Sequence, residues 1–107
     1  MSLDSTSPAP VFAALGDAVR LKLVARLSDG RQYSITQLAE GIELSRQGVT
    51  KHLHVLNKAG IVSREIVGRE SRFTLQPDSL ATAQDYLARA SAQWDDAITR
   101  LKKQVEG

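Results

Sequence analysis

The sequence has 107 residues, the length of one compact domain, so we expect a single domain over residues 1–107. The absence of cysteine excludes disulfides and thiolate metal sites, and the absence of a long apolar run predicts a cytoplasmic protein with no signal peptide and no membrane contact. The net charge is only +2, but residues 45–75 carry six basic and two acidic side chains, whereas the segments before and after them each carry four basic and five acidic side chains.

Three helices are predicted in the first 44 residues. The first spans residues 8–15, where apolar side chains fall on one helical face. Asp17 is suited to cap the N-terminus of a second helix, which Asp29-Gly30 ends. Residues 34–37 fit a capping box that begins a short third helix ending near Gly41. The apolar positions expected to face the core are Val11, Phe12, Leu15, Val19, Leu23, Val24, Leu27, Leu38 and Ile42.

A fourth helix is predicted over residues 45–59. Ser45 can accept a hydrogen bond from a backbone N–H of the first turn, and Gly60 suits the positive φ that is common just after a helix. At about 100° per residue, one face of this helix is apolar and the other carries only polar donors. The apolar residues are Val49, Leu53 and Leu56, and the donors are Gln47, Thr50, Lys51, His54 and Lys58.

The donor face of the fourth helix contains no acidic residue, although solvated helices normally mix Glu and Asp with Lys and Arg. The positive excess of the chain lies in this helix and the segment after it, as expected where a surface contacts a polyanion. A short helix, a tight turn and a longer helix with such a face are typical of a helix-turn-helix motif. The alternative is a surface helix that happens to lack acids.

A β-hairpin is predicted after Gly60, because apolar and polar residues alternate with period two over residues 62–67 and 71–75. The connecting loop is either Gly68-Arg69 alone or longer by two residues, and its tip is basic in both cases. A basic hairpin directly after a recognition helix indicates the wing of a winged helix.

The two-residue loop would fix the pairing within this hairpin. It would place Val67 opposite Glu70 and Glu65 opposite Arg72, and we expect the latter two to form a weak surface ion pair. The side chains expected on the core side of the hairpin are Val62, Ile66, Phe73 and Leu75.

A long final helix begins at Pro77 and carries an apolar stripe with a heptad period. A domain of this size cannot cover so long a stripe, so we expect a second copy of the same helix to do so. The core would then occupy residues 8–76 and the dimerisation helix residues 77–105. The stripe contains Leu80, Leu87, Trp94 and Leu101, with Ala83, Ala90 and Ala97 each three positions later.

These features together resemble the ArsR-type (arsenic-repressor-like) winged-helix regulators. The similarity runs from Phe12 to Leu101 and is strongest in the segments 12–17, 45–53, 59–62 and 68–70, with Arg20, Leu38-Ala39 and Leu56. The resemblance implies a mainly α fold with a minor β part, about five helices and one wing. It also implies a homodimer that binds a palindromic operator on double-stranded DNA, usually as a repressor.

The sequence departs from the metal-sensing members of that family. It has no cysteine pair in the third helix and no histidine in the final helix, so neither family-type metal site is present. His52 and His54 are separated by about 200° around the helix axis and cannot bind one ion together. We therefore expect no metal and no cofactor, and an effector, if one exists, would be an unidentified small molecule or protein.

The candidate DNA contacts each have a plainer interpretation. Arg46 is suited equally to a guanine edge and to a phosphate, and Gln47 is suited to adenine. His54 is expected to contact DNA, whereas His52, at the edge of the apolar face, is expected to be a hydrogen-bonded packing residue. Arg69 is either a solvated turn residue or a minor-groove contact. The full set of candidates is Ser45, Arg46, Gln47, Thr50, Lys51, His54, Arg64, Arg69 and Arg72.

The dimer contacts are expected along the final helix and at the first helix. Trp94 is interpreted as an interface anchor rather than a ligand platform, because it lies on the heptad stripe. No phosphate-binding loop, activated nucleophile or carboxylate pair indicates an enzyme. The competing function is a winged helix that binds an acidic partner protein. The candidate interface residues are Phe12, Leu80, Leu87, Trp94 and Leu101.

Overall fold

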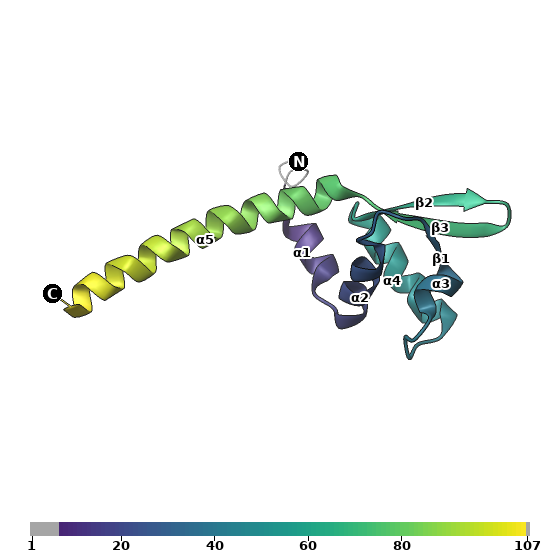
Figure 1. Cartoon of the computed structure of the whole chain (residues 1–107), viewed down its shortest axis with the longest axis horizontal. Coiled ribbons are helices and arrows are strands. Elements are labelled where there is room, and N and C mark those ends of the chain that lie inside the picture. Colours follow the sequence, from purple (N-terminus) through teal and green to yellow (C-terminus); the bar gives the residue numbers. More distant parts are fainter. Residues whose placement is uncertain (1–6, 107) are drawn as a thin grey trace.

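Five α-helices and a three-stranded antiparallel sheet make up residues 7–106, the part of the chain that the computed structural model describes (Figure 1). This confirms the predicted mainly α winged-helix class; residues 1–6 and 107 of the expected domain lie outside the described part. The elements are α1 (Ala9–Leu15), α2 (Ala18–Leu27), β1 (Tyr33–Ser34), α3 (Ile35–Ala39), α4 (Arg46–Lys58), β2 (Val62–Val67), β3 (Glu70–Leu75) and α5 (Pro77–Glu106).

The helices begin where side-chain oxygens accept hydrogen bonds from first-turn N–H groups. The Asp17 carboxylate accepts from two N–H groups of α2, and the Ser45 hydroxyl accepts from the Gly48 N–H of α4. Ser34 and Gln37 form both hydrogen bonds of the predicted capping box of α3. Each of these caps was predicted from the sequence.

The C-terminus of α4 ends in a Schellman motif. Gly60 has a φ of 78°, its N–H donates to the Asn57 carbonyl, and the next N–H, of Ile61, donates to the Leu56 carbonyl. Ile61 is fully buried, which anchors this turn in the core. The chain can therefore leave α4 and enter β2 within three residues.

The core lies where the apolar faces of α1, α2, α3 and α4 meet the sheet. The apolar face of α4 is fully buried against α1, α2, α3 and β2. Burial of such side chains supplies the main free energy that holds this helix in place. The largest fully buried side chains are Leu23, Leu27, Leu38, Val49, Leu53, Leu56, Ile61, Val62 and Phe73.

The hairpin has the predicted two-residue loop. Val67 pairs with Glu70 and Glu65 with Arg72, and Gly68 has a φ of 66°, as the first central residue of a type II′ turn requires. Strand β1 was not predicted from the sequence. Its two residues pair with β3, so β3 is the central strand of the sheet. A strand this short carries no periodicity of its own.

Two expectations for the hairpin were wrong. Ile66 was placed on the core side, but it is 64% exposed because the outer half of the hairpin extends away from the helical core (Figure 1). Glu65 and Arg72 face each other in the register but form no ion pair. Arg72 donates to Glu70 of its own strand at 2.8 Å, and Glu65 accepts from Gln32 at 3.1 Å.

Helix α5 starts on the domain and then extends away from it, on the side opposite the hairpin (Figure 1). Ala83 is buried and Leu80 is half buried against the core of the same chain. The rest of the stripe lies outside the domain, and its larger side chains, Leu87, Trp94 and Leu101, are 55%, 69% and 60% exposed. The molecule is accordingly long, with extents of 66 × 35 × 23 Å.

Candidate nucleic-acid interface

The outer face of α4 gathers five candidate residues around one shallow hollow. The helix is 13 residues long, or about 20 Å, and none of its side chains is acidic. The residues that line the hollow are Arg46, Gln47, Thr50, Lys51 and His54. A surface of two fixed positive charges, an amide, a hydroxyl and an imidazole offers both phosphate-binding charges and base-edge hydrogen bonds.

The first turn of α4 uses two of the candidates for its own structure. The Ser45 hydroxyl oxygen accepts from the Gly48 N–H at 3.0 Å, and the Thr50 hydroxyl donates to the Arg46 carbonyl at 2.8 Å. Thr50 therefore keeps acceptor capacity and its methyl group for a ligand, whereas Arg46 and Gln47 remain exposed. The N-terminus of α4 is the end where both of these exposed donors lie.

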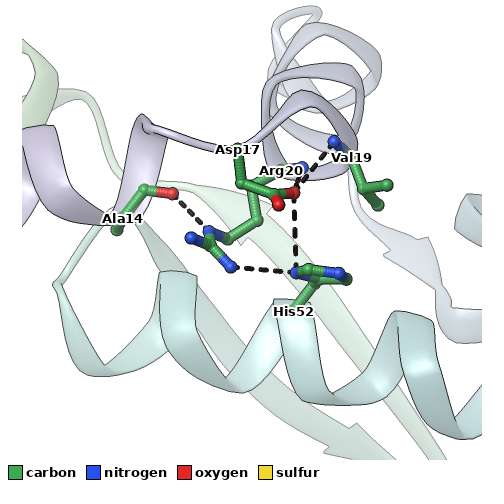
Figure 2. A network of polar contacts seen from close by, with 5 residues as sticks. All are labelled: Ala14, Asp17, Val19, Arg20 and His52. Atoms are coloured by element: carbon green, nitrogen blue, oxygen red, sulfur yellow. Dashed lines mark hydrogen bonds and ion pairs between the residues drawn. The ribbon is translucent and has the colours of Figure 1, made fainter.

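The inner edge of α4 is joined to α2 by a polar network around His52 (Figure 2). Arg20 of α2 donates through Nε to the Ala14 carbonyl and through Nη1 to His52 Nδ1, at 3.0 Å. A guanidinium has only donors, so Nδ1 must act as the acceptor and the imidazole carries its proton on Nε2. His52 is thus a hydrogen-bonded packing residue, as expected, with a side chain 24% exposed.

Asp17 completes this network from the N-terminus of α2 (Figure 2). Its carboxylate accepts from the N–H groups of Val19 and Arg20 at 2.9 and 3.0 Å and lies 3.7 Å from His52 Nδ1. The hydrogen bond from the Arg20 N–H, more than any other contact, lowers the pKa of Asp17 below its ordinary value. The carboxylate therefore stays ionised beside the Arg20 guanidinium.

The three wing arginines differ in what their side chains already contact. Arg64 donates to Ser71 at 3.0 Å and Arg72 is paired with Glu70, so the charge of Arg72 is partly neutralised. Arg69 is exposed at the turn and has no hydrogen bond or ion pair within residues 7–106. Of the three, Arg69 is the one best placed for an external anion.

The candidate dimer residues fall into two groups. Phe12 of α1 and Leu80 of α5 are half buried within the chain, and the Phe12 ring packs edge-on against Tyr86 with centroids 5.7 Å apart. Leu87 and Trp94, with Leu101, are largely exposed on the part of α5 that leaves the domain. Helix α1 lies beside the base of α5 (Figure 1).

The described residues provide neither a metal site nor a membrane-spanning helix. No three His, Asp or Glu side chains of residues 7–106 are close enough to hold one metal ion. None of the helices in that range combines the length and apolar character needed to cross a membrane.

The role of two arginines on α2 was not predicted from the sequence. Arg20 contacts α4 as described, and Arg26 donates to the Leu38 carbonyl of α3 at 2.7 Å. Both side chains are half buried on the flank of an otherwise apolar helix face. Six residues apart, they lie about 120° from each other around the helix axis, so their spacing in the sequence does not indicate a shared inward direction.

Comparison with known proteins places these features in context. The family model described as a helix-turn-helix domain matches residues 15–65. The HTH-type transcriptional regulator Rv2034 of Mycobacterium tuberculosis is 33% identical over 100 residues, which are 94% of this chain and 90% of that protein.

Solved structures give the same result. An ArsR-like transcriptional regulator from Rhodococcus sp. RHA1 is 34% identical, with a TM-score of 0.73 and 90% of both chains covered. A homodimeric winged helix-turn-helix DNA-binding domain from Mycobacterium bovis, a possible ArsR-family regulator, has a TM-score of 0.62 over 79% of this chain and 80% of that one. At 18% identity the second likeness concerns the fold alone.

Proposed function

The chain belongs to the ArsR-like family of winged helix-turn-helix transcriptional regulators, and from that premise we propose that it is a repressor that binds an inverted-repeat operator as a homodimer. The observation that carries the proposal is the outer face of α4, where five donor-bearing side chains surround one hollow without an acidic neighbour. Bound over a promoter, such a dimer would exclude other proteins from the same DNA.

We propose that α4 enters the major groove with Gln47 and Thr50 against base edges. Gln47 is exposed, and its amide can form two hydrogen bonds with adenine. Arg46, near the N-terminus of the helix, is suited to a guanine edge or to a phosphate. Arg69 at the wing tip is assigned to the minor groove. The remaining contacts are assigned to phosphates, namely Ser45, Lys51, His54 and the wing residues Arg64 and Arg72.

The dimer is proposed to form through α5. Leu87, Trp94 and Leu101 lie on one heptad stripe and are more than half exposed in the single chain, and a second copy of α5 is the partner that matches such a stripe. The Mycobacterium bovis domain of similar fold is homodimeric, which supports a dimer of this chain. Phe12 and Leu80 would border this interface from the domain side.

The competing function is binding of an acidic partner protein by the basic face. The two functions differ in how affinity depends on salt. When a protein neutralises Z phosphates of a duplex, the logarithm of the binding constant falls linearly with the logarithm of the salt concentration, with a slope of about −0.9Z. We expect the logarithm of the affinity for duplex DNA to fall steeply and linearly with the logarithm of the salt concentration, for operator and scrambled sequences alike. Absence of measurable duplex binding at low salt would favour the protein partner instead.

The proposal can be tested without knowledge of the operator. A library of randomised duplexes is incubated with the full chain, and the bound duplexes are sequenced after several rounds of selection. We expect an inverted repeat whose half-sites are centred about one helical turn apart, near 34 Å. A selected site without inverted symmetry would contradict the dimer part of the proposal.

A further inference from the structure

The two helices of the helix-turn-helix motif are each hydrogen-bonded to α2 by one arginine. Arg26 donates to the Leu38 carbonyl of α3, and six residues earlier Arg20 donates to His52 of α4. Arg20 is itself held on its other side by the Ala14 carbonyl of α1. Helix α2 thus connects the DNA-facing motif to α1, which lies beside the base of α5 (Figure 1).

The contact at His52 is the side-chain link between the body of α4 and another helix. The Ser79 hydroxyl of α5 also donates to the Gly60 carbonyl in the turn after α4, but within residues 7–106 no other side-chain hydrogen bond or ion pair joins residues 46–58 to another helix. The rest of its attachment is apolar packing of Val49, Leu53 and Leu56. Apolar contacts depend weakly on direction, whereas a hydrogen bond weakens steeply when its angle departs from linear. The rotation of α4 about its own axis is therefore fixed most sharply at His52.

That rotation decides which side chains meet the base edges. His52 follows Lys51 and precedes His54 by two residues, so it is rigidly joined to the outer face of the same helix. A turn of the helix by a small angle displaces Gln47 and Thr50 sideways relative to DNA. Bidentate base contacts need close geometry, whereas a phosphate contact by a long flexible side chain tolerates the displacement.

We propose that Arg20, acting through His52, is a positioning residue that sets the rotation of the recognition helix and thereby the sequence preference of the protein. Neither side chain needs to contact DNA for this role. The inference rests on the proposed function, because it concerns the same face of α4. Asp17 supports the arrangement from the cap of α2, where its carboxylate accepts from the Arg20 N–H at 3.0 Å.

The test uses the full chain and two duplexes, the one that the wild type selects from a random library and a scrambled duplex of equal composition. Arg20→Met and His52→Leu each remove one side of the hydrogen bond and keep an apolar side chain of similar size. His52→Gln restores an acceptor for the guanidinium. Lys22→Met is the matched control, because it removes one exposed positive charge from the same helix. Circular dichroism and sedimentation establish the folded and oligomeric state of each variant.

We expect Arg20→Met and His52→Leu to lower the ratio of selected to scrambled affinity by about tenfold or more, comparable to losing one base contact. The double variant should lose no more than the single variants, and His52→Gln should keep most of the ratio. Lys22→Met should lower both affinities alike. A fall with His52→Leu but not with Arg20→Met would mean that His52 itself contacts DNA, and would overturn the inference.

Failure of the inference is distinct from failure of the proposed function. Folded Arg20→Met and His52→Leu proteins that keep the wild-type ratio overturn the inference alone. A wild type that selects no sequence overturns the proposed function and the inference with it. If Arg20→Met does not fold, the two His52 variants decide between the outcomes. Equal ratios of selected to scrambled affinity for His52→Leu and His52→Gln would overturn the inference.

Discussion

The polar side chains at the inner edge of α4 have a structural role, unlike the donors on its outer face. Arg20 donates to His52 and to the end of α1, Asp17 accepts from the Arg20 N–H, and none of the three side chains is fully buried (Figure 2). Asp17 alone bonds two orphan N–H groups at the start of α2. A change at one of these residues is therefore expected to affect stability through its charge as well as its hydrogen bonds.

Because Asp17 is charged, the stability of the protein varies with pH in the acidic range. Its pKa is lowered in the folded protein, so the stabilisation is fully present above its ordinary value of about 3.9 and is lost as the pH falls through the lower folded value. Asp17→Asn keeps a cap acceptor but removes the charge. We expect the wild type to melt at a higher temperature than the variant at about pH 5, and the difference to shrink by about pH 2.5. A difference that stays constant over this range would show that the charge plays no part.

Whole helices and the hairpin register were predictable because their signals are local. Ser34 with Gln37, Ser45 and Gly60 mark helix ends by spacing alone, and Gly68-Arg69 fixes the pairing of β2 with β3. The features that were predicted wrongly or not at all depend on contacts between residues that are distant in the sequence. Strand β1 exists only through its pairing with β3, and the exposure of Ile66 follows from how far the hairpin extends beyond the core.

The candidate site was predictable to a similar degree. The grouping of Gln47, Thr50 and Lys51 follows from helical periodicity, and the structure places them around one hollow. The link from Arg20 to His52 joins residues 32 positions apart and has no local signal. The pairing of Arg72 with Glu70 rather than Glu65 reflects side-chain choices on an exposed strand, which register alone does not determine.

The junction of α4 and α5 gives a test at the level of elements. At Gly60, φ is 78° and an added Cβ would lie 3.0 Å from the Ser79 hydroxyl, which donates to the Gly60 carbonyl at 2.7 Å. Gly30 has the same φ, but an added Cβ there meets nothing within 4 Å. Gly30→Ala should cost about 1 to 2 kcal/mol, from the backbone alone.

Gly60→Ala should cost more than Gly30→Ala, because the strained backbone is combined with a displaced Ser79. Chemical denaturation of both variants measures the two free energies of unfolding. Equal losses would mean that the hydrogen bond from Ser79 to the end of α4 contributes nothing to the fold.

The shape of the whole molecule predicts its assembly. A 100-residue compact domain has a radius of gyration of about 13 Å, and this chain has 18.0 Å because α5 leaves the core. Most of the stability of a helix in a protein comes from packing of its apolar face, so the exposed stripe of α5 needs a partner. We expect Trp94, 69% exposed in the single chain, to become buried when two copies associate.

Substitution of Trp94 tests this assembly. Trp94→Glu would bury a charge in the interface, and Trp94→Ala would remove an anchor whose loss from a packed site costs about 3 to 5 kcal/mol. Both should shift the protein toward monomer in sedimentation experiments and weaken operator binding together with dimerisation. Ala92→Glu is the control, because it adds the same charge at an exposed position off the stripe. A folded Trp94→Glu dimer with wild-type operator affinity would place the interface elsewhere.

The most direct test of the account measures sequence preference after the outer face of α4 is altered. Gln47→Ala combined with Thr50→Ala removes the two proposed base contacts but none of the basic residues, each contact being worth about 1 to 3 kcal/mol of discrimination. The affinities of wild type and double variant are compared on the selected inverted repeat and on a scrambled duplex at equal salt. We predict that the double variant binds both duplexes weakly and equally. A double variant that kept the wild-type preference would show that another surface recognises the operator.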